Sequence, residues 1–167
     1  PEFFPYYEYT ILRQISYYGR QTYIIDFKFR ENAAIPGFDG KIYLDVESLA
    51  LVRCEFSFNE EGLHHAYGLL IRKAPMNLKI NPKYGHYEVE YRYYDEKWNL
   101  NHARSEIALK VRKKRGRRNK GFTCNFASSS EFVITGKATE DFERIKYRDA
   151  SKPGDILYEQ ISQSDID

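Results

Sequence analysis

Apolar and polar side chains alternate with a period of two along most of residues 1–136, and this alternation constrains the fold more than any other feature of the sequence. In Tyr23–Phe29 every odd position is apolar, and most even positions, such as Asp26 and Lys28, are polar. A two-residue period places successive side chains on opposite faces of a β-strand. Several such runs, separated by Gly, Pro or acidic turn residues, predict antiparallel hairpins.

Aromatic residues are unusually frequent, with 15 Tyr, 11 Phe and one Trp making up 16% of the 167 residues. Pleated sheets accommodate such side chains well. The alternation predicts that eleven of the rings share one face of the sheet. These are Tyr7, Tyr9, Tyr17, Tyr23, Phe27, Phe29, Phe56, Phe58, Tyr87, Tyr91 and Tyr93.

One segment, residues 60–71, has helical spacing instead. Asn59 can act as its N-cap, apolar residues then recur every three or four positions, and Pro75 follows its end. We therefore predict a mostly β fold: a strongly curved, half-barrel-like antiparallel sheet with one helix, at about 60–71, on the concave face.

The sequence divides into a predicted sheet domain, 1–136, and a polar, acidic tail, 137–167, which we expect to dock partly near 156–158. The chain begins at Pro1 and not at Met, which we interpret as a processed or truncated piece.

Three segments resemble a family of Gram-negative cell-envelope proteins called carboxypeptidase regulatory-like domain-containing proteins. They are Tyr23–Phe27, Gly40–Arg53 and Arg72–Pro75, and the resemblance extends over most of residues 6–136. It implies a C-terminal region similar to the half-barrels of periplasmic lipoprotein carriers, and a location in the periplasm or cell envelope. It implies no peptidase activity, and we expect residues 1–167 not to include the small sandwich domain that gives the family its name.

The sequence contains no phosphate-binding loop, dinucleotide fingerprint or zinc-protease motif, so we expect no catalytic residue, metal or cofactor. Four His residues and the carboxylates of the predicted strands are interpreted as surface groups and cross-strand charge pairs. A hydrolase that uses Glu90 or His102 remains an alternative. Cys54 and Cys124 are expected to be buried free thiols, or a disulfide if their strands are neighbours.

The segment Lys113–Lys120 carries six bases in eight residues. Three interpretations remain open: a solvated hairpin tip whose charge discourages aggregation, a site for an anionic lipid head group, or a nucleic-acid contact. Nucleic acid is disfavoured because the aromatic residues lie outside this segment.

One short helix cannot cover seven long strands, so we expect part of the aromatic face to stay open as a ligand site. The leading hypothesis is a non-enzymatic envelope domain that holds an acyl chain or another lipid-like ligand. The rival is a structural module with a filled core that docks on another envelope protein. The expected ligand contacts are Tyr67, Leu70 and Ile71 as a lid, Phe27, Phe56, Tyr91 and Tyr93 as a wall, and Arg115, Arg117 and Arg118 at a head group.

Overall fold

The fold is known from a computed structural model that describes residues 4–30, 37–115 and 120–136. The chain divides into two compact units, Pro1–Ile134 and Thr135–Asp167, and every described helix and strand belongs to the first. The tail predicted at 137–167, with its docking segment, lies outside the described residues.

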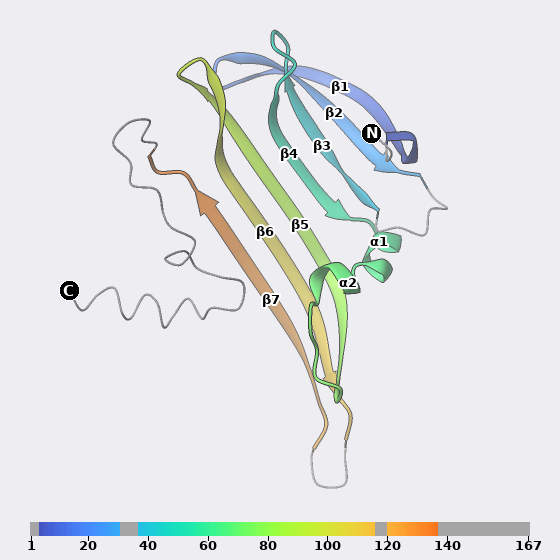
Figure 1. The fold of residues 1–167 in the computed structure, drawn as a ribbon. Helices are drawn as coiled ribbons and strands as arrows, with labels where there is room; N and C mark the ends of the chain where they lie inside the picture. The colour runs from blue at the N-terminus through green and yellow to red at the C-terminus, as the bar shows by residue number, and fades with distance from the viewer. Residues whose placement is uncertain (1–3, 31–36, 116–119, 137–167) are drawn as a thin grey trace, which may run out of the picture. The chain divides into compact units, whose positions relative to one another are not determined.

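Seven strands, two short α-helices and one 3-10 turn make up the described part of the first unit (Figure 1). In chain order they are η1 (Phe4–Tyr6), β1 (Tyr7–Tyr17), β2 (Arg20–Phe29), β3 (Phe38–Asp45), β4 (Leu51–Phe58), α1 (Glu60–His65), α2 (Tyr67–Leu70), β5 (Leu78–Tyr94), β6 (Lys97–Lys113) and β7 (Phe122–Val133).

The strands form a single antiparallel sheet in the order of the sequence, β1 to β7. Short turns explain the pairs β1–β2, β3–β4 and β5–β6, because a short connection can only join antiparallel neighbours. Tyr18 and Gly19 turn the chain between β1 and β2, and Asp95 and Glu96 between β5 and β6, all four with positive φ. The prediction of a mostly β, antiparallel fold is therefore confirmed.

The sheet is open, with β1 and β7 as its two edges. It is neither closed nor strongly curled, so the strong curvature predicted from the sequence is not seen. Alternation specifies which side chains share a face, but it does not specify how far a sheet bends.

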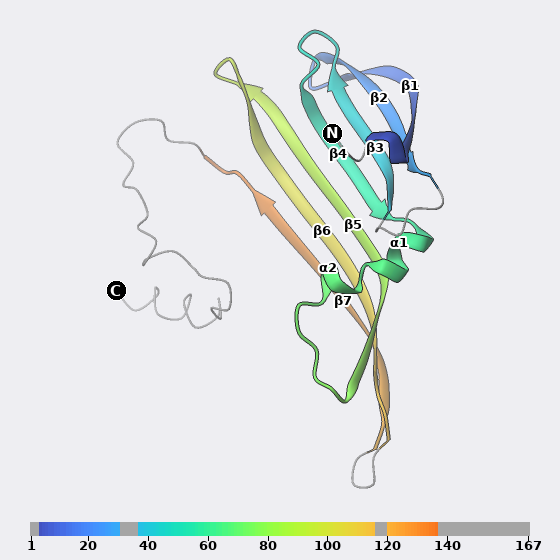
Figure 2. The ribbon, with the colours of Figure 1, turned by 45° about the vertical axis from the view of Figure 1, so that its right-hand side comes forward.

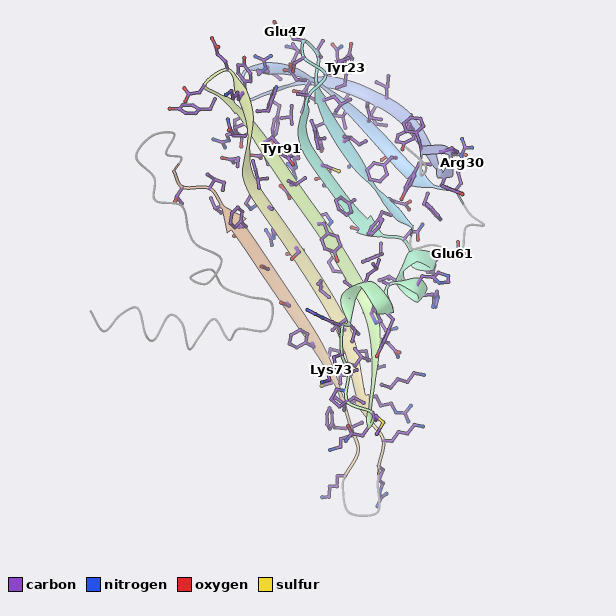
Figure 3. All side chains as sticks on the ribbon, viewed as in Figure 1. Tyr23, Arg30, Glu47, Glu61, Lys73 and Tyr91 are labelled. Atoms are coloured by element: carbon purple, nitrogen blue, oxygen red, sulfur yellow. The ribbon has the colours of Figure 1, made fainter. Side chains whose placement is uncertain are left out.

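Two short helices replace the single predicted helix (Figure 2). Asn59 caps α1 as expected, since its Oδ1 accepts a hydrogen bond of 2.6 Å from the backbone N–H of Gly62. The α-helical ladder is interrupted at Ala66, whose N–H bonds to the carbonyl of Leu63, only three residues earlier. This tighter closure separates α1 from α2.

The register corrects two predictions. An extra residue, Leu12, interrupts the pairing of β1 with β2 between Ile11 and Arg13. A bulge of this kind moves every later side chain to the other face, so Tyr17 does not share a face with Tyr7. The sequence run Ser128–Ser130 also predicts a bulge or bend, but β7 pairs with β6 without a register shift.

The buried apolar core is small. Among the described residues it consists of Ile24, Phe29, Tyr43, Val52, Phe58 and Ala66. Ile24, Tyr43 and Val52 form one cluster, against which Ile15, Tyr17 and Trp98 pack. The sheet therefore hides few of its apolar side chains in an ordinary core.

Gly40 allows β3 and β4 to approach closely, and it provides a test of the register. A Cβ at this position would lie 2.1 Å from the carbonyl oxygen of Glu55 and 2.7 Å from the Cα of Phe56. Because both atoms belong to the backbone, Gly40→Ala is expected to lower the free energy of unfolding by about 1–3 kcal/mol in urea titrations.

Gly68 in α2 is the matched control, because a Cβ there would meet nothing within 4 Å. Gly68→Ala should be neutral or stabilise the protein by up to about 1 kcal/mol, since alanine favours the helix. Equal effects of the two substitutions would contradict the observed β3–β4 register.

Candidate functional site

Two rows of directly paired residues cross all seven strands on one face of the sheet. Side chains at directly opposite positions of antiparallel strands point to the same face. The first row is Ile11, Ile25, Ile42, Cys54, Val89, Ala103 and Phe132. The second row is Tyr9, Phe27, Gly40, Phe56, Tyr87, Ser105 and Ser130. We call the surface formed by these two rows the apolar face; it holds no charged side chain.

Aromatic rings cluster around Phe56 in the second row. Its ring stacks on that of Tyr87, with centroids 5.3 Å apart, and meets the ring of Phe38 edge-on at 5.3 Å. Despite these contacts, Phe56 and Tyr87 are only half-buried. At the β7 end, Phe132 is 55% exposed. The apolar face therefore remains accessible to solvent across much of the sheet.

The two helices pack near the end of β4 and the start of β5, to one side of these rows. Gly62 of α1 lies against Gly37, and Gly37 lies against the ring of Phe29. These contacts explain why Phe29 is buried while Phe27, two residues earlier, is half-buried.

The opposite face carries the charges. A third row, again crossing all seven strands, contains Thr10, Asp26, Lys41, Glu55, Glu88, Arg104 and Glu131. Arg53 joins two of these carboxylates, with Nη2 at 2.8 Å from Glu55 and 3.2 Å from Glu88. This polar face holds the carboxylates considered for catalysis, and the structure places several of them in ion pairs.

The histidines of the polar face are also engaged. Nδ1 of His86 lies 2.9 Å from Oγ of Ser57, and Nε2 of His102 lies 2.6 Å from Oε1 of Glu131. No group of three or more His, Cys, Asp or Glu side chains that could hold a metal ion occurs within the described ranges.

The predicted ligand contacts lie in three different places. Phe27 and Phe56 belong to the apolar face. Tyr67 is exposed on α2, while Leu70 and Ile71, at its end, are half-buried. The remaining two, Tyr91 and Tyr93, line a small pocket near the β5–β6 turn. The structure thus brings Phe27 and Phe56 onto one surface but does not assemble the seven residues into one site.

That small pocket, of about 120 Å³, combines aromatic rings with two arginines. The guanidinium of Arg20 lies 5.0 Å from the ring centroid of Tyr93, and that of Arg92 lies 4.1 Å from the ring centroid of Tyr18. The hydroxyl of Tyr17 donates a hydrogen bond of 2.6 Å to Glu90. Burial, together with this carboxylate, raises the pKa of Tyr17. Sequence analysis identified neither arginine, because alternation does not reveal contacts between distant turns.

A basic groove of about 530 Å³ lies where the end of β6 meets the starts of β5 and β7. We define it by its lining residues, Lys79, Arg112, Lys113, Lys114, Arg115, Gly121, Phe122 and Thr123. Five of these are basic and none is acidic. Arg115 was predicted as a head-group contact, whereas Arg117 and Arg118 lie outside the described residues.

Sequence analysis missed Lys79 as part of this groove. The clear alternation of aromatic and charged residues in this part of the sequence begins only at Tyr87, which predicts a strand from there, but β5 begins at Leu78 and pairs Lys79 directly with Arg112. The alternation of Leu78, Ile80 and Pro82 with Lys79 and Asn81 could have revealed this longer strand.

An apolar strip connects the apolar face to the basic groove. From the second row it runs along β6 through Ile107, Leu109 and Val111, which are paired with Ser128, Phe126 and Cys124 of β7. The next pair is Lys113 with Phe122, and both line the groove. This face of the sheet is therefore apolar as far as Lys113, whereas Lys79 and Arg112 lie on the opposite face, together with Lys110.

The two cysteines differ in environment. Cys54 is half-buried in the apolar face, and burial raises the pKa of its thiol to about 11. Cys124 is exposed on β7, which contradicts the expectation that both thiols are buried. β4 and β7 are separated by two strands, so the disulfide alternative does not apply.

No helix in the described residues is long and apolar enough to cross a membrane. The sequence matches no protein-family model, and no curated protein or solved structure matches it either.

The Arg20–Asp45 pair anchors the β1–β2 turn to β3, and it should make the protein sensitive to acid. Asp45 is 1% exposed and accepts hydrogen bonds from Nε and Nη2 of Arg20, at 2.7 and 2.9 Å. Arg20 and Ser48 hold the pKa of Asp45 well below its usual range. Because the pKa of Asp45 is lower in the folded state than in the unfolded state, its ion pair stabilises the fold at pH values above the unfolded pKa of about 4. This stabilisation is lost as the pH falls below that value.

We expect Asp45→Asn to lower the free energy of unfolding at pH 7 by about 2 kcal/mol, because it leaves a partly buried guanidinium without its counter-charge. The difference from the wild-type protein should shrink below about pH 4. Glu47→Gln removes the exposed partner of the same arginine and should cost less than about 0.5 kcal/mol. Denaturant titrations between pH 7 and 2 measure the free energy of unfolding of both variants. If the difference between Asp45→Asn and the wild-type protein did not change with pH, this account would be contradicted.

Proposed function

We propose that this domain holds an amphiphile, with its apolar chain on the apolar face and its anionic group in the basic groove. The observation that carries the proposal is the apolar face itself, two uncharged rows that cross seven strands and remain half-exposed. Large exposed apolar patches on proteins mark binding sites.

The dimensions of the face suit a long chain. Seven strands spaced by about 4.8 Å give a width of roughly 29 Å, which is enough for a long acyl chain laid across the strands. Each Å² of apolar surface removed from water contributes about 25 cal/mol, so covering both rows would stabilise a complex substantially. Tyr9 and Tyr87 add hydroxyl groups that can remain in contact with water beside such a chain.

The basic groove would fix the orientation of the amphiphile. Its five cations have no acidic partner among the lining residues, whereas the arginines of the polar face pair with carboxylates. An anionic phosphate or carboxylate group would find unbalanced positive charge there. The apolar strip along β6 and β7 would guide the chain from this groove to the apolar face.

We further propose that the domain acts in the periplasm or cell envelope and without catalysis. The resemblance to cell-envelope proteins with half-barrel carriers supports this location. In this proposal the open sheet is the ligand-free form of a half-barrel, which would bend around a bound chain.

The second candidate function is a structural module whose apolar face is covered by another envelope protein. The exposure of Phe126 and Phe132 at the β7 end favours it, because these rings extend the face to the edge of the sheet. A titration with a fluorescent long-chain fatty acid separates the two functions, since a docking module would not show saturable binding of this lipid.

Neighbouring residues of β6 provide a matched pair of variants to test the chain site. Leu109 belongs to the apolar strip, and Lys110, the next residue, points to the opposite face and does not line the groove. Leu109→Gln should weaken binding of a fluorescent long-chain fatty acid about fivefold or more, since it removes roughly 1 kcal/mol of apolar contact. Lys110→Gln should change the affinity less than about twofold. Equal effects, or no saturable binding by the wild-type protein, would refute the chain site.

The groove is tested by the charge of the ligand. Lys113 is the groove cation on the face of the apolar strip, and Lys113→Gln should weaken fatty-acid binding about fivefold, from roughly 1 kcal/mol per charge. Binding of the uncharged methyl ester of the same fatty acid should be unaffected, and raising the salt concentration should abolish the preference for the acid. A parallel loss for acid and ester would show that the groove does not recognise charge.

A further inference from the structure

Within the described part of the chain, strand β7 is a long and unprotected edge of the sheet. All of its residues, Phe122–Val133, are exposed, and β6 is its only strand partner among the described strands. It contains no proline, no register shift and a single charged residue, Glu131. The outer side of such a strand presents a row of backbone N–H and C=O groups that can pair with another strand. Natural proteins usually block such edges with charges, prolines or bulges.

The other edge, β1, has these protections. Leu12 forms a bulge in its middle, Glu8 and Arg13 are charged, and Pro5 lies in the turn η1 just before it. The backbone N–H of Arg30 also donates a hydrogen bond to the carbonyl of Tyr6, which ties down the start of the strand. The two edges therefore differ sharply in their capacity to accept another strand.

We propose that β7 pairs antiparallel with β7 of a second copy of the chain, around a two-fold axis. A second copy fits better than an end-to-end stack, in which β7 would have to pair with the bulged β1 of its neighbour. Pairing of one surface with itself closes after two subunits, whereas the stack would grow without limit.

The sequence of β7 favours a register centred on Ala127. In this register Phe122 of each copy lies opposite Phe132 of the other, and every residue between them is paired. Aromatic pairs across antiparallel strands are favourable, and like charges directly opposite are unfavourable. Glu131 lies opposite Thr123, so the one charge of the strand meets no like charge. A register centred on Glu131 would place two carboxylates face to face.

The pairing has a structural consequence. A two-fold axis perpendicular to the sheet keeps the same faces together, so the apolar faces of the two copies become one continuous surface. Phe126 and Phe132, exposed at the edge of one copy, then lie in the middle of a sheet twice as wide. The dimer depends on the edge strand alone and not on any bound lipid.

The oligomeric state of the whole chain tests the proposal. Light scattering after size exclusion should give a dimer for the wild-type protein. Ala127→Lys places two ammonium groups opposite each other at the axis and should give a monomer with an unchanged far-UV circular dichroism spectrum, since this side chain is exposed. Thr10→Lys is the control on the exposed part of β1 and should remain dimeric. A wild-type monomer, as would occur if the C-terminal residues of the same chain covered β7, overturns the proposal. A dimer that survives Ala127→Lys also overturns it.

Cross-linking tests the register in a way that does not depend on disrupting the dimer. In a Cys124→Ser background, Ala127→Cys places one thiol from each copy beside the axis, and mild oxidation should convert most of the protein to a covalent dimer. Thr10→Cys in the same background should stay monomeric in denaturing gels. Wild-type Cys124 faces Ser130 in this register and should cross-link far less than Ala127→Cys. Preferential cross-linking through Cys124 would contradict the register centred on Ala127.

Discussion

The fold depends on the register of its seven strands, which shifts at four places in three of the six strand pairs. Because side chains alternate between faces, the pairing that aligns Ile25, Ile42 and Val89 on one face aligns Asp26, Lys41 and Glu88 on the other. A slip of one residue in any strand would bring charges into the apolar rows. An extra residue in a strand, such as Leu12 in β1, moves the side chains that follow it to the other face of the sheet. Tyr17 therefore packs against the small core on the polar face. Register, more than core volume, thus determines which surfaces this sheet presents.

The sheet is stabilised unevenly along its strands. Around the β1–β2 turn, a buried cluster, the Arg20–Asp45 pair and the Tyr17–Glu90 hydrogen bond lie close together. Farther along the strands, cross-strand aromatic contacts such as Phe56–Tyr87 stabilise a face that remains half-exposed. Rigid strands anchored at one end can support an open surface without a thick core. This arrangement is compatible with reversible covering of the apolar face by a ligand.

Charge is balanced on one face and unbalanced at one end of the sheet. The carboxylates Glu55 and Glu88 neutralise Arg53 on the polar face, where these three side chains are only 19–25% exposed. Lys79 and Arg112, in the basic groove, are opposite each other in the β5–β6 pair and lack such partners among the lining residues. The same chain therefore combines paired charges with basic side chains that have no acidic partner among the residues of the groove. Lys113 lines the groove and also ends the apolar strip, so the two surfaces meet at this residue.

The sequence by itself determined the hairpins, the two-sided pattern of the strands and the capped helical segment after Asn59, because these depend on local spacing and turn residues. It could not determine that Tyr91 and Tyr93 leave the wall predicted for Phe27 and Phe56, that Lys79 meets Arg112, or that the sheet stays open. These features depend on bulges, on where strands begin and on twist. Each of them changes which distant residues become neighbours without changing the local alternation, so only the tertiary structure decided them.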